Sequence, residues 1–562
     1  MKNRYDDKLV LFGVSIVFLF LIIVLYHQLP NTFYQQDEWQ ALGNFETGGL
    51  RGAFSLYSLS LLDVLAGKGR FLATPFHYFF YHYSPFQVAY ASILAIVFHL
   101  LNSVLLFIIF KRLFKGIFFA ILAVIFFVTA SVASQSITWM AASTTTLLSS
   151  FFAFLSLLSY IYYLEKKKVK WVWITLLFFI FSFFIKESSI FLLLVYPLIY
   201  FQFLGKKSNV KVAIKDHIPF FLYFILLVFA VFTSIFSEKD PSGLVVTAAP
   251  DSKMRLILHL ILYPFISFSQ VFIGGEFVYK MADSLGRLSY SRIWSEPYSV
   301  IVRETIAADF VSILLTVLLF IILFLICRVD KRLKKPIVWG VVYTLLSFLP
   351  YAVLDKQTSY FESRYYYYAV VGGGVIFASI IIFLRDLIVK ITKLSIAVAT
   401  IICVVFVLLH IWYQISLTHA SLDRDLLYAH QRKNFLSQLK SEIPSLENKA
   451  LFYISGNTEY FLETNRAPFQ QGIGYTLMVW YYRSGTIPKE FITSNFLWVI
   501  GSEGYRESGA NGFGVYSDME LVKLTAEKYR LGKNNIYGLY YDGEKKQLVN
   551  TTEKTRSLLG EQ

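Results

Sequence analysis

Residues 171–204 read WVWITLLFFIFSFFIKESSIFLLLVYPLIYFQFL, two apolar runs that meet at the charged pair Lys186-Glu187. Ionisable side chains inside such an apolar stretch are costly to remove from water and commonly mark a functional site. One interpretation is a tight turn between two membrane spans, from which the long Lys186 side chain reaches the headgroups. The other is a site at which Lys186 binds an anion.

The composition of the whole chain agrees with a membrane protein. Hydrophobic residues make up 56% of the 562 residues and charged residues 16%, whereas soluble domains average about 25% charged residues. The two cysteines, Cys327 and Cys403, lie in apolar runs and provide neither a disulfide framework nor metal-ligand spacing. The formal net charge of +15 does not indicate nucleic acid, because Lys and Arg cluster in short gaps between apolar runs.

The apolar runs predict about eleven transmembrane helices. Their approximate ranges are 9–29, 86–110, 117–134, 144–163, 171–185, 187–204, 217–236, 307–327, 336–354, 366–384 and 394–414.

Two kinds of gap separate the runs, and they alternate along the chain. One kind is rich in Lys and Arg, and the other is long or mixed in charge, so the positive-inside rule predicts a cytoplasmic N-terminus and an external C-terminus. Lys186 then lies outside, where this bias works against a Lys, which favours the anion-binding interpretation. Counting residues 254–275 as a twelfth span would move the basic stretch 328–335 outside, so we expect an interfacial or re-entrant helix there.

The chain changes character after residue 415. About 145 residues follow, enough for a small α/β domain with its own core. We therefore predict a polytopic α-helical membrane protein with a membrane core at 1–415 and a C-terminal extracytoplasmic α/β domain at 416–562. The elements expected in that domain are a helix at 423–439 and strands at 449–456, 496–500 and 535–541.

Asp37 and Glu38 form an acidic pair in the loop that follows the first span. A carboxylate near the membrane surface could accept the proton of an acceptor hydroxyl while a lipid-borne donor lies in the adjacent leaflet. The alternative is a solvated acidic loop. The dipeptide alone does not distinguish the two.

Glu362 and Arg364 precede a run of tyrosines, residues 365–368, at an outer boundary of a predicted span. Tyrosine prefers the membrane–water interface, so an aromatic belt accounts for the tyrosines. The belt does not account for Arg364, whose planar guanidinium fits phosphate oxygens. We expect both features here, a belt and a site at which Arg364 binds a lipid phosphate.

His99 and Asn102 lie three residues apart on one face of the second predicted span. Polar pairs in such a position more often join helices by hydrogen bonds than form a site. His77 and His82 lie in the first external loop, five residues apart and without a further nearby ligand, which is a weak signal for a metal.

These features together resemble the GT-C superfamily of polyprenyl-phosphate-sugar-dependent glycosyltransferases, and within it the protein O-mannosyltransferase and TMTC-type membrane cores. The likeness covers residues 1–415. It rests on short motifs in matching order, which are Asp37-Glu38, Arg70-Phe-Leu through Phe86, His99-Leu-Leu-Asn102 with Lys111-Arg112-Leu-Phe, Ile137-Thr-Trp139, Ile185-Lys186-Glu187-Ser188 and Glu362-Ser-Arg364-Tyr365.

The chain also departs from that pattern. TMTC-type proteins carry His residues and an Arg-Lys-Asp group around their Ala-Trp segment, where this chain reads SVAS at 131–134 and ASTTT at 142–146. The TPR array of those proteins is missing, and a different C-terminal domain stands in its place. The donor sugar and the acceptor therefore do not carry over.

The resemblance implies transfer of a sugar from an undecaprenyl- or dolichyl-phosphate donor, with inversion, to an extracytoplasmic protein, lipid or envelope glycan. The protein would be integral to the membrane, the cell membrane if it is prokaryotic, with membrane lipid and the sugar donor as partners and no nucleic acid. No ligand set demands a metal, although a divalent ion is compatible with the chemistry. The implied site residues are Asp37 as general base with Glu38 orienting the acceptor or tuning Asp37, Lys186, Arg364 and Tyr365 at the lipid phosphate, and Arg70, Glu187 and Glu362 in support.

Two other classes of function stay open. A lipid-linked glycan flippase or transporter would also hold charges within the membrane, and such proteins often show internal repeats, which this sequence does not show. A non-catalytic envelope-assembly protein would bind through the C-terminal domain and would need no acid at residue 37.

Overall fold

The computed structural model describes most of the chain. The described residues are 2–35, 38–39, 41–43, 45–46, 70–83, 86–204, 218, 225, 252–275, 277–278, 280–282, 284, 300–352, 363–457, 473–482, 487–492, 504–545 and 547–559. They divide into two compact units. The membrane unit comprises Met1–His27, Leu59–Ala73 and Ser92–Ala420, and the C-terminal unit comprises Gln28–Ser58, Thr74–Ala91 and Ser421–Gln562.

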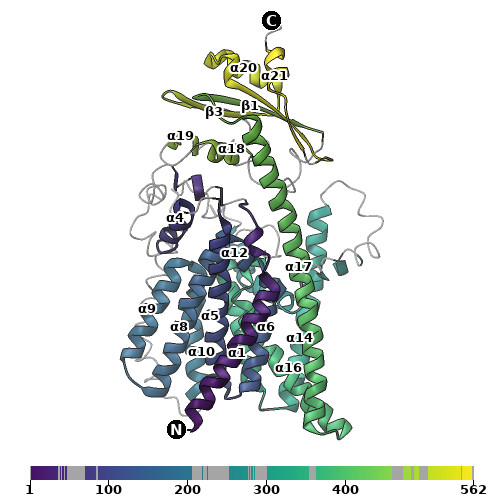
Figure 1. The fold of residues 1–562 in the computed structure, drawn as a ribbon. Coiled ribbons are helices and arrows are strands. Elements are labelled where there is room, and N and C mark those ends of the chain that lie inside the picture. The colour runs from purple at the N-terminus through teal and green to yellow at the C-terminus, as the bar shows by residue number, and fades with distance from the viewer. Residues whose placement is uncertain are drawn as a thin grey trace. The chain divides into compact units, whose positions relative to one another are not determined.

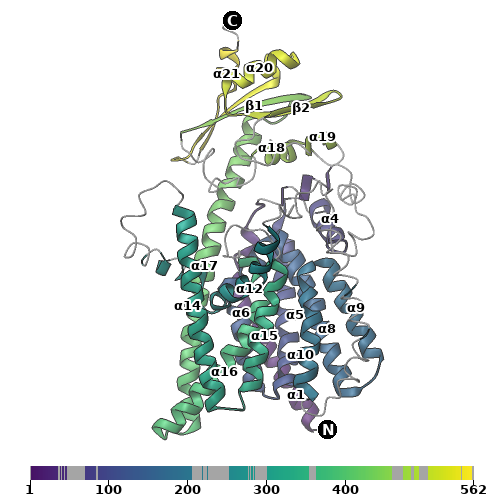
Figure 2. The ribbon, with the colours of Figure 1, turned by 180° about the vertical axis from the view of Figure 1, so that it is seen from behind.

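Long apolar helices dominate the membrane unit and run roughly along one direction in both views (Figures 1 and 2). Its elements are α1 (Lys2–Tyr26), α5 (Val88–Phe114), α6 (Ile117–Thr129), η2 (Ser131–Ala133), α7 (Gln135–Thr138), α8 (Met140–Lys166), α9 (Lys170–Ile185), η3 (Glu187–Phe191), α10 (Leu192–Leu204), α12 (Ser252–Gln270), α14 (Val300–Val329), α15 (Lys334–Ala352), η5 (Ser363–Tyr365), α16 (Ala369–Thr392) and the first part of α17 (Ile396–Glu442).

Five helices among the described residues are long and apolar enough to cross a membrane. They are α1, α5, α8, α14 and α17, and a sixth span results if the bent pair formed by α6 with η2 and α7 is counted as one. Every predicted apolar run except 217–236 overlaps a described helix, and that run lies almost wholly outside the described residues. The chain is thus a polytopic helical membrane protein, while eleven spans and their orientation stay predictions.

The helix that begins as α6 breaks after Thr129 and continues at an angle of 51°. At the break the backbone N–H of Ser131 donates to Oε1 of Gln414 at 2.9 Å, and the Ser131 hydroxyl donates to the same oxygen at 2.7 Å. Non-helical backbone within a membrane protein needs such partners, because lipid offers none. The break leads into η2 and α7, which hold the segment of Arg364 in place.

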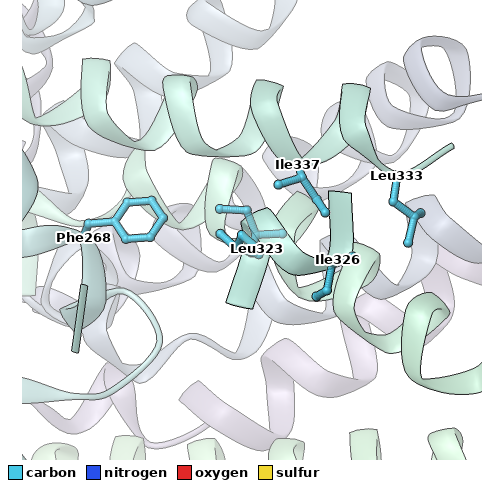
Figure 3. Packing of buried hydrophobic residues seen from close by; sticks show 6 residues of the cluster. Phe268, Leu323, Ile326, Leu333 and Ile337 are labelled. Carbon is cyan, nitrogen blue, oxygen red and sulfur yellow. The ribbon is translucent and has the colours of Figure 1, made fainter. Parts of the chain in front are cut away.

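The helix α12, predicted as an interfacial or re-entrant segment, is not among the candidate spans. Its C-terminal half is buried, and Phe268 packs with Leu323 and Ile326 of α14 and Ile337 of α15 (Figure 3). Phe320 lies with its ring centroid 4.8 Å from that of Phe268. This contact holds α12 against α14 and α15 within the bundle.

Glycines allow α16 to approach its neighbours closely. A methyl group at Gly374 would collide with the carbonyl group of Ala123 in α6, and one at Gly372 would lie 2.5 Å from the carbonyl oxygen of Gly340 in α15. Small residues at such positions let membrane helices pack backbone to backbone.

Gly374→Ala is therefore expected to lower the free energy of unfolding by about 1–3 kcal/mol, the usual cost of overpacking. Alanine improves helix propensity by up to ~1 kcal/mol, so the matched control is Gly13→Ala on α1, where no heavy atom lies within 4 Å of the added methyl. Thermal unfolding of the two detergent-solubilised variants measures the change in stability of each. A Gly374→Ala protein as stable as Gly13→Ala would contradict the close approach of α16 to α6.

The C-terminal unit contains a five-stranded sheet in the order β2-β3-β1-β4-β5. The central strand β1 pairs in parallel with β3 and β4, while β2 and β5 pair antiparallel at the edges. Its elements are η1 (Leu29–Asn31), α4 (Ala73–Tyr83), the end of α17, β1 (Lys449–Gly456), α18 (Ile473–Tyr481), α19 (Lys489–Ile492), β2 (Gly504–Ser508), β3 (Asn511–Tyr516), α20 (Met519–Tyr529), η7 (Lys533–Asn535), β4 (Ile536–Asp542), β5 (Gln547–Asn550) and α21 (Thr552–Leu558).

Helices cover both faces of this sheet, with α20 and α21 on one face and α18 and α19 on the other (Figures 1 and 2). Successive strand residues point to opposite faces. Leu451 accordingly packs with Val522 of α20, and the ring centroid of the next residue, Phe452, lies 6.2 Å from that of Tyr481 of α18. The predicted helix and the first and third predicted strands are confirmed, and the strand at 496–500 lies outside the described residues.

Candidate functional site

Lys186 lies at the turn between α9 and η3, outside both helices, with an extended backbone (φ −153°, ψ 120°). The backbone N–H still donates to the carbonyl of Ser182 at 3.0 Å, so the turn directly continues α9. The side chain is only 5% exposed, and its Nζ donates to the Thr146 hydroxyl of α8 at 2.6 Å. Lys186 therefore points into the unit, and the interpretation of a lysine that reaches the lipid headgroups is wrong.

Arg70 and Glu187 form a bidentate ion pair. The Arg70 Nε donates to Glu187 Oε2 at 3.1 Å, and its Nη2 donates to Oε1 at 3.0 Å. The backbone N–H of Leu72 donates to the carbonyl of Phe184 at 3.2 Å, which ties the Arg70 turn to α9. Both side chains are 45% exposed, so the pair contributes little to stability but fixes the direction of both groups.

Arg364 lies on η5, which the broken segment holds in place. The Ser136 hydroxyl donates to the Arg364 carbonyl at 2.8 Å, and the Ser363 hydroxyl donates to the carbonyl of Val132 at 2.7 Å. The guanidinium stacks over the Trp139 ring at 4.4 Å and donates to the Tyr365 hydroxyl at 3.3 Å. Stacking on an aromatic ring fixes the plane of a guanidinium, whose fork matches the geometry of phosphate oxygens.

The charges of these segments act on one another. Burial, together with the nearby Arg70 and Arg364 guanidiniums, lowers the pKa of Lys186 to about 7, while Glu187 opposes them. The charge of Arg364 thus acts on that of Lys186, while a shared lipid-phosphate site for the two residues stays a prediction. The four charged groups include three cations and one carboxylate, an arrangement that favours an anion.

Three further acidic residues were predicted for the site. Asp37 and Glu362 lie outside the described residues. Glu38 belongs to the C-terminal unit, is 2% exposed, and accepts a hydrogen bond from the backbone N–H of Gln35 at 2.6 Å. The interpretation of a solvated acidic loop is wrong for Glu38.

The tyrosine run does not form an aromatic belt at Tyr366, Tyr367 and Tyr368, because each is at most 1% exposed. Their hydroxyls instead bind polar side chains inside the bundle. Tyr366 donates to Gln270, and the Tyr368 hydroxyl lies 3.0 Å from that of Ser149. The run anchors the segment after Arg364 to its neighbouring helices.

The polar pair on α5 joins helices, as predicted. His99 Nδ1 lies 2.9 Å from the Tyr367 hydroxyl, and Asn102 Nδ2 donates to the same hydroxyl at 3.2 Å. Asn102 also donates to the carbonyl of Leu147 on α8 at 3.1 Å.

Two residues of the candidate site have no predicted role from sequence. The Thr146 hydroxyl accepts a hydrogen bond from Lys186, and the Trp139 ring stacks against the Arg364 guanidinium. The signal for Thr146 was the hydroxyl-rich stretch 142–146 in an otherwise apolar run. The Trp139 indole is 3% exposed and its Nε1 has no hydrogen-bond partner, so a donor beside Arg364 is left for a ligand or water.

The fold and site thus define an integral membrane protein of the polytopic helical class with a cluster of three cations and one carboxylate, in which Lys186 is buried and Arg70 and Glu187 are partly exposed. Among the residues that the structure describes, no group of three or more His, Cys, Asp or Glu side chains could hold a metal ion. No protein-family model matches the chain, and no curated protein matches it.

Proposed function

We propose that this protein is a membrane glycosyltransferase that moves a sugar from a polyprenyl-phosphate donor to an extracytoplasmic acceptor. The observation that carries the proposal is the cluster of Arg70, Lys186 and Arg364, three segments of the membrane unit in which Arg70 pairs with Glu187 and both guanidiniums act on the charge of Lys186. A cluster with this excess of positive charge attracts an anion, and the polyprenyl phosphate is an anion that reaches a membrane protein from the lipid. The resemblance to the GT-C superfamily supports the same donor.

The proposed chemistry gives a role to Asp37, Lys186 and Arg364. The acceptor hydroxyl attacks the anomeric carbon and gives its proton to the Asp37 carboxylate. The bond from the anomeric carbon to the phosphate oxygen breaks, and the polyprenyl phosphate leaves with the electron pair. Lys186 and Arg364 stabilise the charge that develops on that phosphate. Attack opposite the leaving group inverts the anomeric configuration.

The proposed topology puts this chemistry outside the cytoplasm. Eleven spans with a cytoplasmic N-terminus place residues 415–562 outside, because the basic gaps alternate with the long ones. A reporter fused after Gln562 that is active only in the cytoplasm would contradict this orientation.

Donor binding is expected to weaken as pH rises through the pKa of Lys186. The protonated ammonium attracts the phosphodiester and the neutral amine does not, so affinity is full below about pH 7. Above that pKa, affinity falls by at most about tenfold per pH unit.

Lys186→Arg supplies the control, because a guanidinium stays charged throughout this range. Its donor affinity is expected to change little with pH. Equilibrium binding of a fluorescent polyprenyl-phosphate sugar to protein in nanodiscs measures both slopes. If donor affinity falls equally with pH in the wild type and in Lys186→Arg, Lys186 does not bind the phosphate.

Deletion of the gene tests the proposed function as a whole. We expect cells without the protein to lose one surface glycan or glycan modification and to accumulate the lipid-linked sugar. Loss of the glycan with the donor trapped on the cytoplasmic face would instead indicate a flippase. Unchanged glycans and unchanged lipid-linked sugars would contradict the proposal.

A further inference from the structure

Four lysines gather at the turn between α8 and α9. Lys166 ends α8, Lys170 begins α9, and Lys167 and Lys168 lie between them, all with exposed side chains. This lysine turn lies at the end of the membrane unit at which α1 begins (Figures 1 and 2). The 16 residues of α9 separate it from Lys186 by roughly 24 Å along the helix axis. It is therefore distinct from the candidate site.

The lysine turn has little acidic counterpart in the sequence around it. Glu165 is the one Asp or Glu within residues 160–175 and within residues 111–115 at the end of α5. Its carboxylate accepts two hydrogen bonds from Nη1 of Arg112, at 2.8 and 3.0 Å. In the part of the chain that the structure describes, the four lysines of the turn form no ion pair. Their charge is therefore not offset by the protein.

The basic turn between α14 and α15 is different. Nη2 of Arg332 donates to Oδ2 of Asp330 at 2.7 Å and to Oδ2 of Asp386 at 2.8 Å. Nη2 of Arg385 donates to Oδ1 of the same Asp386 at 2.7 Å. Carboxylates of the protein offset the cations there, whereas at the lysine turn this is left to water, salt or a ligand.

Aromatic rings lie beneath the ammonium groups of the lysine turn. Lys166 Nζ lies 4.8 Å from the ring centre of Tyr162 and 5.4 Å from that of Trp171. Lys170 Nζ lies 5.8 Å from the Trp171 ring centre, and the rings of Tyr162 and Trp171 stack with their centroids 4.9 Å apart. Distances within about 6 Å allow cation–π attraction. The positive-inside rule accounts for the charge of these lysines but not for their placement over rings.

Lys167 is placed in the same way. Its Nζ lies 5.4 Å from the ring centre of Tyr163 and 5.8 Å from that of Tyr200 on α10, and both tyrosines are buried. Its backbone N–H donates to the carbonyl of Tyr163 at 2.8 Å, which fixes the turn to the end of α8. A cation that is already held in place loses less side-chain freedom when it binds a ligand. The turn is therefore preorganised for an anion.

An apolar surface continues from the lysine turn along α9. Val169, Trp173 and Leu177 are spaced four residues apart, so they lie on one side of the helix. They are 66%, 60% and 49% exposed. Acyl chains would cover this surface, whereas a free phosphate would not. Tyrosine and tryptophan beside the cations are typical of the membrane–water interface. The two surfaces together fit a ligand with an anionic headgroup and apolar chains.

We propose that the lysine turn binds the phosphate headgroup of an anionic phospholipid, whose acyl chains lie against Val169, Trp173 and Leu177. The phosphate takes the place of the missing carboxylates, and the rings hold the ammonium groups ready for it. The attraction is electrostatic and weakens as salt is added. The inference does not depend on sugar transfer, so the failure of either leaves the other standing.

Native mass spectrometry of the purified full-length protein in detergent measures the affinity for the first bound lipid. Phosphatidylglycerol is the probe, and phosphatidylcholine with the same acyl chains is the neutral comparison. We expect the wild type to bind phosphatidylglycerol at least about tenfold more tightly, since each basic residue near a headgroup contributes about fivefold. Equal affinity for the two lipids would overturn the inference.

The Lys166→Gln/Lys170→Gln protein tests the location of the site. We expect its affinity for phosphatidylglycerol to fall by about tenfold or more and its affinity for phosphatidylcholine to stay unchanged. The matched control is Lys390→Gln/Lys393→Gln, which removes two exposed lysines at the end of α16 and should bind both lipids as the wild type does. An equal loss in the two double variants, or a loss in neither, would overturn the inference.

Inorganic phosphate distinguishes a lipid site from a site for free anions. With the ionic strength held constant by sodium chloride, we expect added phosphate to leave the affinity for phosphatidylglycerol unchanged. Displacement of the lipid by millimolar phosphate under these conditions would assign the turn to a soluble anion and overturn the inference.

A further variant covers the case in which the loss of two lysines changes insertion into the membrane. Trp171→Leu keeps every charge but removes the ring that Lys166 and Lys170 share. We expect its affinity for phosphatidylglycerol to be about two- to fivefold weaker than that of the wild type. Wild-type affinity would show that the ring does not position the lysines and would overturn the inference.

Discussion

The Asp37→Asn protein is expected to insert and to bind the donor normally but to transfer sugar about 10²–10⁴-fold more slowly, the usual contribution of a general base. Asparagine keeps the size and hydrogen-bonding shape of aspartate but cannot accept the proton of the acceptor hydroxyl. The loss should therefore fall on kcat rather than on donor affinity. Single-turnover transfer and donor binding, measured on the same purified protein, separate the two.

Glu38→Gln is the informative comparison, because the two acids are adjacent but differ in their surroundings. Glu38 is buried and close to Arg432, and removal of one partner from a buried pair costs about 3–5 kcal/mol. We expect this variant to lose stability and, in the folded fraction, to lose less activity than Asp37→Asn. Near-normal turnover of Asp37→Asn would remove Asp37 as base, and a reversal of the two effects would assign the base to Glu38.

The Arg364→Ala protein is expected to show the second largest loss. Removing one preorganised donor from a developing charge commonly costs about 10²–10³ in kcat. Donor affinity should fall as well, because the guanidinium that stacks on Trp139 supplies planar donors for phosphate oxygens. Transfer rates over a range of donor concentrations measure both effects.

Two further variants serve as comparisons for Arg364→Ala. Arg364→Lys keeps the charge but loses the planar fork and the stacking on Trp139, so we expect only partial rescue. Lys390→Ala removes an exposed cation near the other end of α16 and should leave transfer unchanged. Equal activity of Arg364→Ala and Lys390→Ala would exclude Arg364 from the donor site.

Local patterns in the sequence predicted a large part of the fold. Apolar runs long enough to cross a membrane become helices because lipid leaves the backbone no other way to satisfy its hydrogen bonds. The strand at 449–456 was equally readable, since a short apolar run with Phe, Tyr and Ile that ends at a glycine is typical of a strand. Each of these elements is marked by the residue types within its own stretch of chain.

The charged residues of the candidate site could be predicted from the sequence, but the side chains that contact them could not. Lys186 and Arg364 stand out because a cation in an apolar run needs an explanation. Thr146 and Trp139 do not stand out, because a hydroxyl or an indole is common in membrane helices and acquires its task only when distant segments pack. The tyrosines at 366–368 were misplaced for a related reason, since the same ring and hydroxyl suit both a lipid interface and a buried hydrogen bond.

The partner of Glu38 was likewise invisible in the sequence. Arg432 lies almost 400 residues further on, in a helix of mixed polarity where a basic residue draws no notice. Only the folded C-terminal unit brings the two charges together. Long-range pairs of this kind depend on tertiary packing and leave no local pattern.

Reconstitution of the purified protein tests the central claim most directly. The wild type and the Asp37→Asn and Arg364→Ala variants would be placed in liposomes that contain a radiolabelled polyprenyl-phosphate sugar and an envelope fraction from cells that lack the gene. We expect the wild type to move label from lipid to the acceptor fraction and both variants to do so at least about 100-fold more slowly. Movement of the intact lipid-linked sugar across the bilayer with no transfer of label, at equal rates in all three proteins, would contradict the account.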